Sequence, residues 1–184
     1  RALLELRTSF DPARLTAALT VAAKAQLAGP GVAEQLLGAE VAGAFKLRAT
    51  ESDLVTPLRA HWREPKAPVA LAVIRALREM GAGPVELFEE IGRQSTDAAL
   101  RDEALGALAA STDSRAPDVL VKLLPGLTPA QRGSALQRLA GTKAGAIALM
   151  AGVRGGTVAS ADLGVNTVDR LRTLLPADPQ VAEL

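Results

Sequence analysis

The chain has 184 residues, of which 48% are hydrophobic, 22% charged and 2% aromatic, and its net charge is +1. It contains no Cys and one His, which excludes disulfides, Cys-ligated zinc, thiol nucleophiles, haem attachment and two-histidine metal motifs within this span. The balanced charge and the scarcity of aromatic rings disfavour nucleic acid or an anionic membrane as partner, and no apolar run predicts a membrane-spanning helix.

The apolar residues are mainly Ala and Leu, with 37 and 29 copies against three Phe, one Trp and no Tyr. Ala and Leu enter helices at little cost, whereas the β-branched and aromatic residues that favour strands are sparse. The composition therefore predicts an all-α fold.

Helix starts are predicted where Pro follows a residue that can cap, because the missing N–H of Pro would be unpaired there anyway. These starts are Asp11-Pro12, Thr56-Pro57, Thr128-Pro129 and Asp178-Pro179, and Thr128 to Gln131 has capping-box spacing. Glycines that can adopt a left-handed conformation predict helix ends at Gly29, Gly81, Gly92, Gly126 and Gly141. The predicted helices lie at residues 12–28, 32–49, 53–63, 67–80, 84–94, 97–110, 116–124, 129–140, 143–154 and 165–175.

Apolar residue pairs repeat at a nearly constant distance along the chain. The pairs are Ile74 and Leu77, Leu105 and Leu108, Leu136 and Leu139, and Val168 and Leu171, separated by steps of 31, 31 and 32 residues. A second apolar helix follows each of the first three pairs, and one such hairpin cannot bury its apolar face without stacking on neighbours. We therefore predict one α-solenoid over residues 1–184, with degenerate repeats in 1–65 and clearer repeats of about 31 residues in 66–184.

The Asp-Pro helix starts, the Ala- and Leu-rich segment 100–108 and the aliphatic second helices resemble the HEAT-repeat family over residues 66–184. The resemblance implies a right-handed, armadillo-type superhelix of antiparallel helical hairpins with a concave binding surface. Such a fold implies a non-catalytic protein-interaction or scaffold module, bound to a protein partner or to a neighbouring domain of the same chain.

Segments 144–150, 153–158 and 168–171, with Asp162-Leu163, also resemble the HEAT region of planctomycete-type multidomain proteins. There, such repeats lie between a dehydrogenase-like β-propeller and a cytochrome c domain, although the Cys-x-x-Cys-His of the haem site is absent here. This resemblance implies a structural spacer in a periplasmic protein, and otherwise we expect a cytoplasmic one. Because Arg1 and Leu184 both lie within helical patterns, we also expect that the sequence is part of a longer chain.

His61, Trp62 and Arg63 form the one cluster that combines the His, the Trp and basic side chains. Trp supplies contact area, Arg supplies paired donors and His responds to pH near neutrality, so the cluster could bind an anion or a partner. The alternative is a helix end at which Trp62 covers the interior and the basic groups complement the helix dipole.

Glu86, Glu89 and Glu90 share one helix face, where paired carboxylates could serve acid/base chemistry or bind a cation. Arg93 can neutralise Glu89 or Glu90, which favours a solvated face instead. The residues expected nearest a binding face are His61, Trp62, Arg63, Glu86, Glu90, Arg93 and Lys122.

No catalytic residue, metal ligand, cofactor or small-molecule site is predicted. The glycine clusters lack a P-loop Lys, and neither Ser95 nor Ser111 lies on a strand-to-helix elbow. Arg75, Arg78, Arg132 and Arg138 could form a basic stripe that follows a phosphate backbone, as in HEAT-like DNA-alkylation glycosylases. An enzyme of that kind, or a bilin lyase, is the alternative to the non-catalytic reading.

Overall fold

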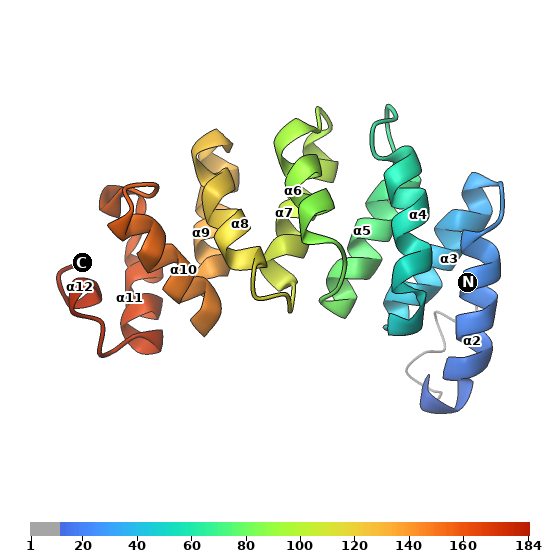
Figure 1. The fold of residues 1–184 in the computed structure, drawn as a ribbon, viewed down its shortest axis with the longest axis horizontal. Coiled ribbons are helices and arrows are strands. Elements are labelled where there is room, and N and C mark those ends of the chain that lie inside the picture. The colour runs from blue at the N-terminus through green and yellow to red at the C-terminus, as the bar shows by residue number, and fades with distance from the viewer. Residues whose placement is uncertain (1–11) are drawn as a thin grey trace. The chain divides into compact units, whose positions relative to one another are not determined.

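The computed structural model describes residues 12–184, with side chains from Thr16 onwards. Within this range it contains eleven α-helices, three short 3-10 helices and no strand (Figure 1). The α-helices are α2 (Pro12–Leu27), α3 (Val32–Ala44), α4 (Glu51–His61), α5 (Pro68–Met80), α6 (Val85–Gln94), α7 (Ala98–Ala110), α8 (Ala116–Leu123), α9 (Pro129–Leu139), α10 (Lys143–Arg154), α11 (Val165–Leu174) and α12 (Pro179–Ala182). The 3-10 helices are η1 (Arg48–Thr50), η2 (Leu124–Gly126) and η3 (Ser160–Asp162). The prediction of an all-helical chain is confirmed for the described residues.

Two of the four predicted proline starts are confirmed. Helices α9 and α12 begin at Pro129 and Pro179, while the start predicted at Asp11-Pro12 depends on residue 11, which lies outside the described residues. The hydroxyl of Thr128 accepts the N–H of Gln131, whose side chain returns to the N–H of Thr128, so the capping box is formed.

The fourth proline start, at Thr56-Pro57, is wrong. Helix α4 begins at Glu51, so Pro57 lies inside it, buried, and leaves one carbonyl without its helical donor. Glu51 and Asp53 occupy the first turn, where the helix dipole favours negative charge, and this favours a start before Pro57.

The helix predicted over 32–49 ends early. Helix α3 stops at Ala44, and Lys46 then adopts a left-handed conformation with φ of 50°. This turn directs Leu47 into the interior, where it is 2% exposed, before η1 leads into α4. The burial of Leu47 explains why the helical pattern does not continue.

Of the predicted glycine stops, Gly81 has the expected left-handed conformation, with φ of 62°, directly after α5. Gly29 and Gly141 follow helix ends and Gly126 ends η2, but none of the three is left-handed. The stop predicted at Gly92 is wrong, because this residue is buried within α6, which continues to Gln94.

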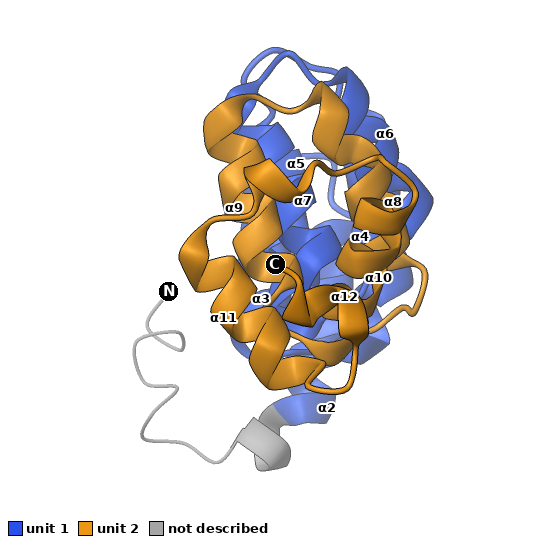
Figure 2. Ribbon diagram, turned by 90° about the vertical axis from the view of Figure 1, so that its left-hand side faces the viewer, with its two compact units in different colours: residues 1–111 blue, residues 112–184 orange. Residues whose placement is uncertain are grey.

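The chain divides into two compact units, residues 1–111 and 112–184, which Figure 2 colours separately. In the first unit α2 packs on α3, α4 on α5 and α6 on α7, and α5 also contacts α3 and α7. Ile74, Leu77, Leu105 and Leu108 are each at most 5% exposed, so the apolar pairs on α5 and α7 form part of its core.

Helices α3 and α5 approach each other closely. A Cβ atom added to Gly43 would lie 2.8 Å from the Cα of Ala76, so the space between the two backbones is too small for one methyl group. The abundance of small residues in the sequence therefore has a structural use in this unit.

In the second unit α10 contacts α8, α9 and α11, and α11 also contacts α9 and α12. Leu136 and Leu139 on α9 are buried, as is Leu171 on α11, while Val168 is half-buried. The repeating pairs that the sequence spacing identified therefore point inwards on all four of their helices.

Candidate functional site

The cluster predicted around Trp62 lies where α4 ends. Trp62 follows the last residue of α4 and is only 5% exposed, so its indole covers the interior of the first unit. The guanidinium carbon of Arg63 lies 4.1 Å from the centre of the indole ring, in a cation–π contact. Trp62 thus supports Arg63 rather than projecting towards solvent.

Side-chain contacts with carboxylates hold the two residues that flank Trp62. Arg63 donates to Glu90 on α6, which is 27 positions away in the sequence. Nδ1 of His61, the last residue of α4, lies 3.0 Å from Oε1 of Glu64 in the following loop. Of the predicted site residues, the structure therefore brings together His61, Trp62, Arg63 and Glu90.

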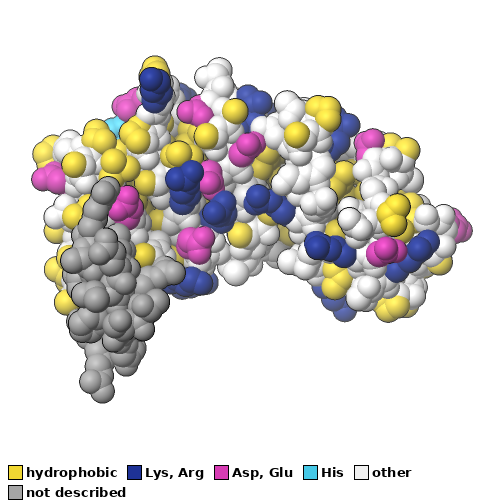
Figure 3. Space-filling model, turned by 180° about the vertical axis from the view of Figure 1, so that it is seen from behind, with side chains coloured by type: hydrophobic (Ala, Val, Ile, Leu, Met, Phe, Trp, Pro, Cys, Tyr) yellow, Lys and Arg dark blue, Asp and Glu magenta, His cyan; other side chains and the backbone are white. Residues whose placement is uncertain are grey.

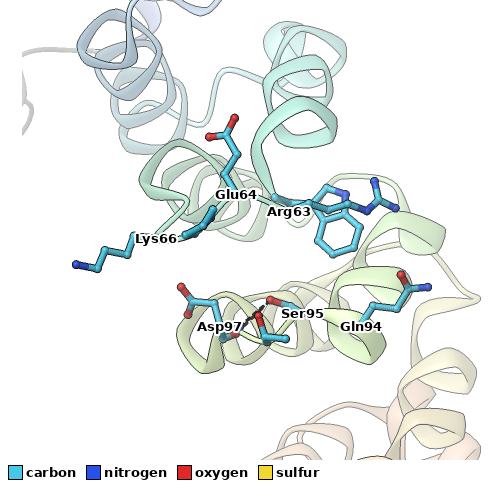
Figure 4. Close-up of a pocket in the computed structure, with 9 residues that line it drawn as sticks. Arg63, Glu64, Lys66, Gln94, Ser95 and Asp97 are labelled. Atoms are coloured by element: carbon cyan, nitrogen blue, oxygen red, sulfur yellow. Dashed lines mark hydrogen bonds between the residues drawn. The ribbon is translucent and has the colours of Figure 1, made fainter.

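Below this cluster lies an open groove of about 490 Å³ between the α4–α5 loop and the α6–α7 loop. In Figure 4, Arg63 and Lys66 extend towards opposite ends of the groove, and Gln94, Ser95 and Asp97 form the facing wall. The groove is lined by Trp62, Arg63, Glu64, Pro65, Lys66, Gln94, Ser95, Thr96 and Asp97.

Internal hydrogen bonds fix the α6–α7 wall of the groove. Oδ1 of Asp97 accepts the N–H groups of Ala99 and Leu100, at 2.8 and 3.2 Å, and so caps α7. Ser95 is 4% exposed, its hydroxyl accepts the N–H of Asp97 at 3.2 Å, and its carbonyl accepts the guanidinium of Arg101. This wall is therefore a rigid structure rather than a set of free polar groups.

Three exposed side chains on the rim differ from this wall. Lys66, Gln94 and Thr96 make no side-chain hydrogen bond or ion pair with any described residue. Lys66 also has a left-handed backbone, with φ of 53°. Sequence reasoning did not single out these three residues, because loop residues without a motif give no signal until the fold brings two loops together.

The acidic face predicted on α6 is divided between partners. Nη2 of Arg93 donates to Glu89 at 2.8 Å, whereas Glu90 binds Arg63. Glu86 is exposed one turn earlier on the same helix. The carboxylates therefore do not converge on one point, as a catalytic pair or a cation site would require.

Lys122, the remaining predicted site residue, is exposed on α8 in the second unit. It lines no part of the groove, which lies within the first unit.

The predicted basic stripe is largely neutralised. Arg75 and Arg78 on α5 both donate to Glu103 on α7. Arg132 donates to the carbonyl of Leu124 at 3.2 Å and lies 3.5 Å from Asp162. Among the four stripe residues only Arg138 makes no ion pair with a described residue, so the arrangement does not present four free cations to a phosphate backbone.

Within residues 12–184, no three His, Cys, Asp or Glu side chains gather in a way that could hold a metal ion. No helix in this range is both long enough and apolar enough to cross a bilayer. Neither family models nor curated proteins nor solved structures match the chain.

Proposed function

We propose that the chain is a HEAT-like stack of helical hairpins that serves as a protein-interaction or scaffold module. The inward orientation of apolar pairs spaced by 31 or 32 residues supports the repeat architecture. In such a stack the helices supply stiffness, and partners bind through the surfaces and loops that the helices hold in place.

The observation that carries the proposal is the groove between the α4–α5 and α6–α7 loops. Its walls are fixed by Asp97, Ser95 and the contact of Arg63 with Trp62, while the side chains of Lys66, Gln94 and Thr96 on the rim have no partner within the described chain. A fixed wall reduces the entropy lost on binding, and unpaired rim groups offer hydrogen bonds to an incoming chain.

The groove is open, and several of the charged side chains beside it already contact one another. Arg63 pairs with Glu90, and Glu64 contacts His61, so these polar groups already have partners before anything binds. This pattern fits the rim of a protein–protein contact, which combines a small apolar centre with polar surroundings. We place the contact surface of the module here, with His61, Trp62, Arg63 and Glu90 as its supporting residues.

Site-specific photo-cross-linking in the producing cells tests this proposal. A benzophenone amino acid replaces Thr96 on the groove rim in one variant and Glu40 on α3 in the other, both exposed in the structure. We expect a discrete protein adduct from position 96 that is lost when Arg63→Glu and Lys66→Glu are added. Equal adducts from both positions, or none from position 96, would contradict the proposal.

A further inference from the structure

The second unit carries a surplus of positive charge that its internal ion pairs do not cancel. Residues 112–184 contain eight Lys and Arg side chains and six Asp and Glu side chains. Four Arg–Asp pairs are formed, and they are Arg115–Asp113, Arg132–Asp162, Arg154–Asp178 and Arg172–Asp169. The cations outside these pairs are Lys122, Arg138, Lys143 and Arg170.

Three of these cations belong to neighbouring elements. Arg138 is exposed in the last turn of α9, and Lys143 is the exposed first residue of α10, directly after the α9–α10 turn. Nη1 of Arg170 on α11 lies 3.4 Å from the carbonyl oxygen of Gln137, next to Arg138 in the chain. The fourth cation, Lys122, lies on α8 with Asp118 one helical turn before it.

The surplus charge of the unit therefore gathers at the C-terminal end of α9, in a patch made of Arg138, Lys143 and Arg170. The acidic residue nearest to it in sequence is Asp169, whose Oδ1 lies 3.9 Å from Nη1 of Arg172. Figure 3 shows Lys and Arg side chains, with some Asp and Glu side chains among them, on the face of this part of the chain that is seen from behind.

We propose that the patch of Arg138, Lys143 and Arg170 binds an acidic segment of a protein partner, an inference that rests on the proposed interaction function. We choose an acidic segment as the ligand because of charge complementarity, since three cations without carboxylate partners attract a segment rich in Asp and Glu. The guanidinium of Arg170 keeps N–H groups beyond its contact with Gln137, and Arg donors match a carboxylate in paired geometry.

A protein segment fits the patch better than nucleic acid does. All four aromatic residues of the chain, Phe10, Phe45, Trp62 and Phe88, precede residue 112, so this unit has no ring on which bases could stack. The remaining arginines of the unit are held by aspartates, so the basic surface does not continue along the helices as a phosphate track would require.

Fluorescence anisotropy with the 184-residue chain and a labelled hexaglutamate peptide tests the patch. In a buffer of about 50 mM NaCl, where screening is moderate, we expect saturable binding that weakens as salt rises. Lys143→Glu should weaken it by about fivefold or more, because the reversed charge repels the peptide within the screening length. Lys122→Glu, a matched charge reversal on an exposed lysine outside the patch, should change the affinity by less than about twofold.

Several results would overturn the inference. One is the absence of peptide binding at low salt, and another is an equal loss of affinity in the Lys122→Glu and Lys143→Glu variants. The third is a DNA duplex that binds more tightly than the peptide and whose binding Lys143→Glu abolishes. Circular dichroism of both variants shows whether they are folded. Arg138→Lys with Arg170→Lys keeps the charge but loses the paired donors, so it should weaken binding less than Lys143→Glu does. Because Thr96 lies in the other unit, failure here leaves the cross-linking result at the groove unaffected, and the two proposals fail separately.

Discussion

Nη1 of Arg78 on α5 donates to Oε2 of Glu103 on α7 at 2.6 Å, and the Glu103 side chain is only 15% exposed. Nε of Arg75, one turn earlier on α5, donates to the other carboxylate oxygen at 2.9 Å. One carboxylate thus binds two arginines of the neighbouring hairpin and satisfies two cations that could otherwise attract an anionic ligand.

Removing this carboxylate should destabilise the first unit. Glu103→Ala leaves Arg78, which is 31% exposed, with only the longer contact to Glu79 at 3.9 Å, and we expect a loss of about 2 kcal/mol in the free energy of unfolding. Arg75→Ala should cost less, about 0.5 kcal/mol, because the Arg75 side chain is 56% exposed. Urea denaturation followed by circular dichroism measures both, and an equal cost for the two variants would show that burial does not govern this network.

A second prediction concerns the residue at which α3 ends. After α3 the N–H of Leu47 donates to the carbonyl of Ala42 at 2.9 Å, and after α5 the N–H of Ala82 donates to that of Leu77 at 3.0 Å. Both ends thus have the same capping geometry, but Lys46 holds the left-handed position after α3 that Gly81 holds after α5.

Because a left-handed conformation is strained for a residue with a Cβ, Lys46→Gly should raise the free energy of unfolding by about 1 kcal/mol. Gly81→Ala should lower it by a similar amount, about 1 kcal/mol. Lys46→Ala is the control, since it removes the charge and keeps the strain, and it should leave stability nearly unchanged. A gain from Lys46→Ala equal to that from Lys46→Gly would assign the effect to the charge.

A third prediction compares two helical glycines. At Gly43 a methyl group would meet the Cα of Ala76 at 2.8 Å, whereas at Gly133 in α9 nothing lies within 4 Å. Gly133→Ala should therefore stabilise the protein by up to about 1 kcal/mol through helix propensity. Gly43→Ala should destabilise it by about 1–3 kcal/mol, because overpacking outweighs the same propensity gain. Thermal unfolding curves decide the signs, and a stabilising Gly43→Ala would refute the close approach of α3 and α5.

The fourth prediction concerns the start of the second unit. Arg115 holds the pKa of Asp113 below its ordinary value of 3.8, first through a side-chain hydrogen bond and then through its backbone N–H. Because the folded-state pKa is lowered, the stabilisation is present above the ordinary pKa and is lost as pH falls through the folded-state value. Arg115→Ala removes the guanidinium but keeps the N–H, so the Asp113 pKa should rise part of the way towards 3.8. Carboxyl chemical shifts followed by NMR over acidic pH test this, and an unchanged midpoint would contradict the assigned cause.

The sequence was sufficient to predict most helices because their limits are set locally. Thr128 and Asp178 cap the helices that follow them through contacts two or three residues away, and such contacts are visible in a linear pattern. The apolar pairs such as Leu105 and Leu108 were identifiable for the same reason, since helical periodicity determines which face is buried.

Features that depend on two distant segments were not predictable. Nothing in the sequence around Arg63 selects Glu90 as its partner, and the pairing of Arg75 with Glu103 joins residues 28 positions apart. The groove likewise exists only because two loops meet, and Lys66 and Thr96 give no signal within either loop alone. Pro57 shows the limit even for local rules, since a start signal is overridden where acidic residues and packing extend the helix backwards.

The buried position of Trp62 also gives the protein a built-in optical reporter. Since the chain has one Trp and no Tyr, its ultraviolet-excited emission comes from this single indole, which is 5% exposed in the first unit. Emission should therefore lie at short wavelength in the native state and shift to longer wavelength when the end of α4 opens. Far-ultraviolet ellipticity averages over all helices, so a difference between the two melting curves would reveal residues 112–184 unfolding as a separate step.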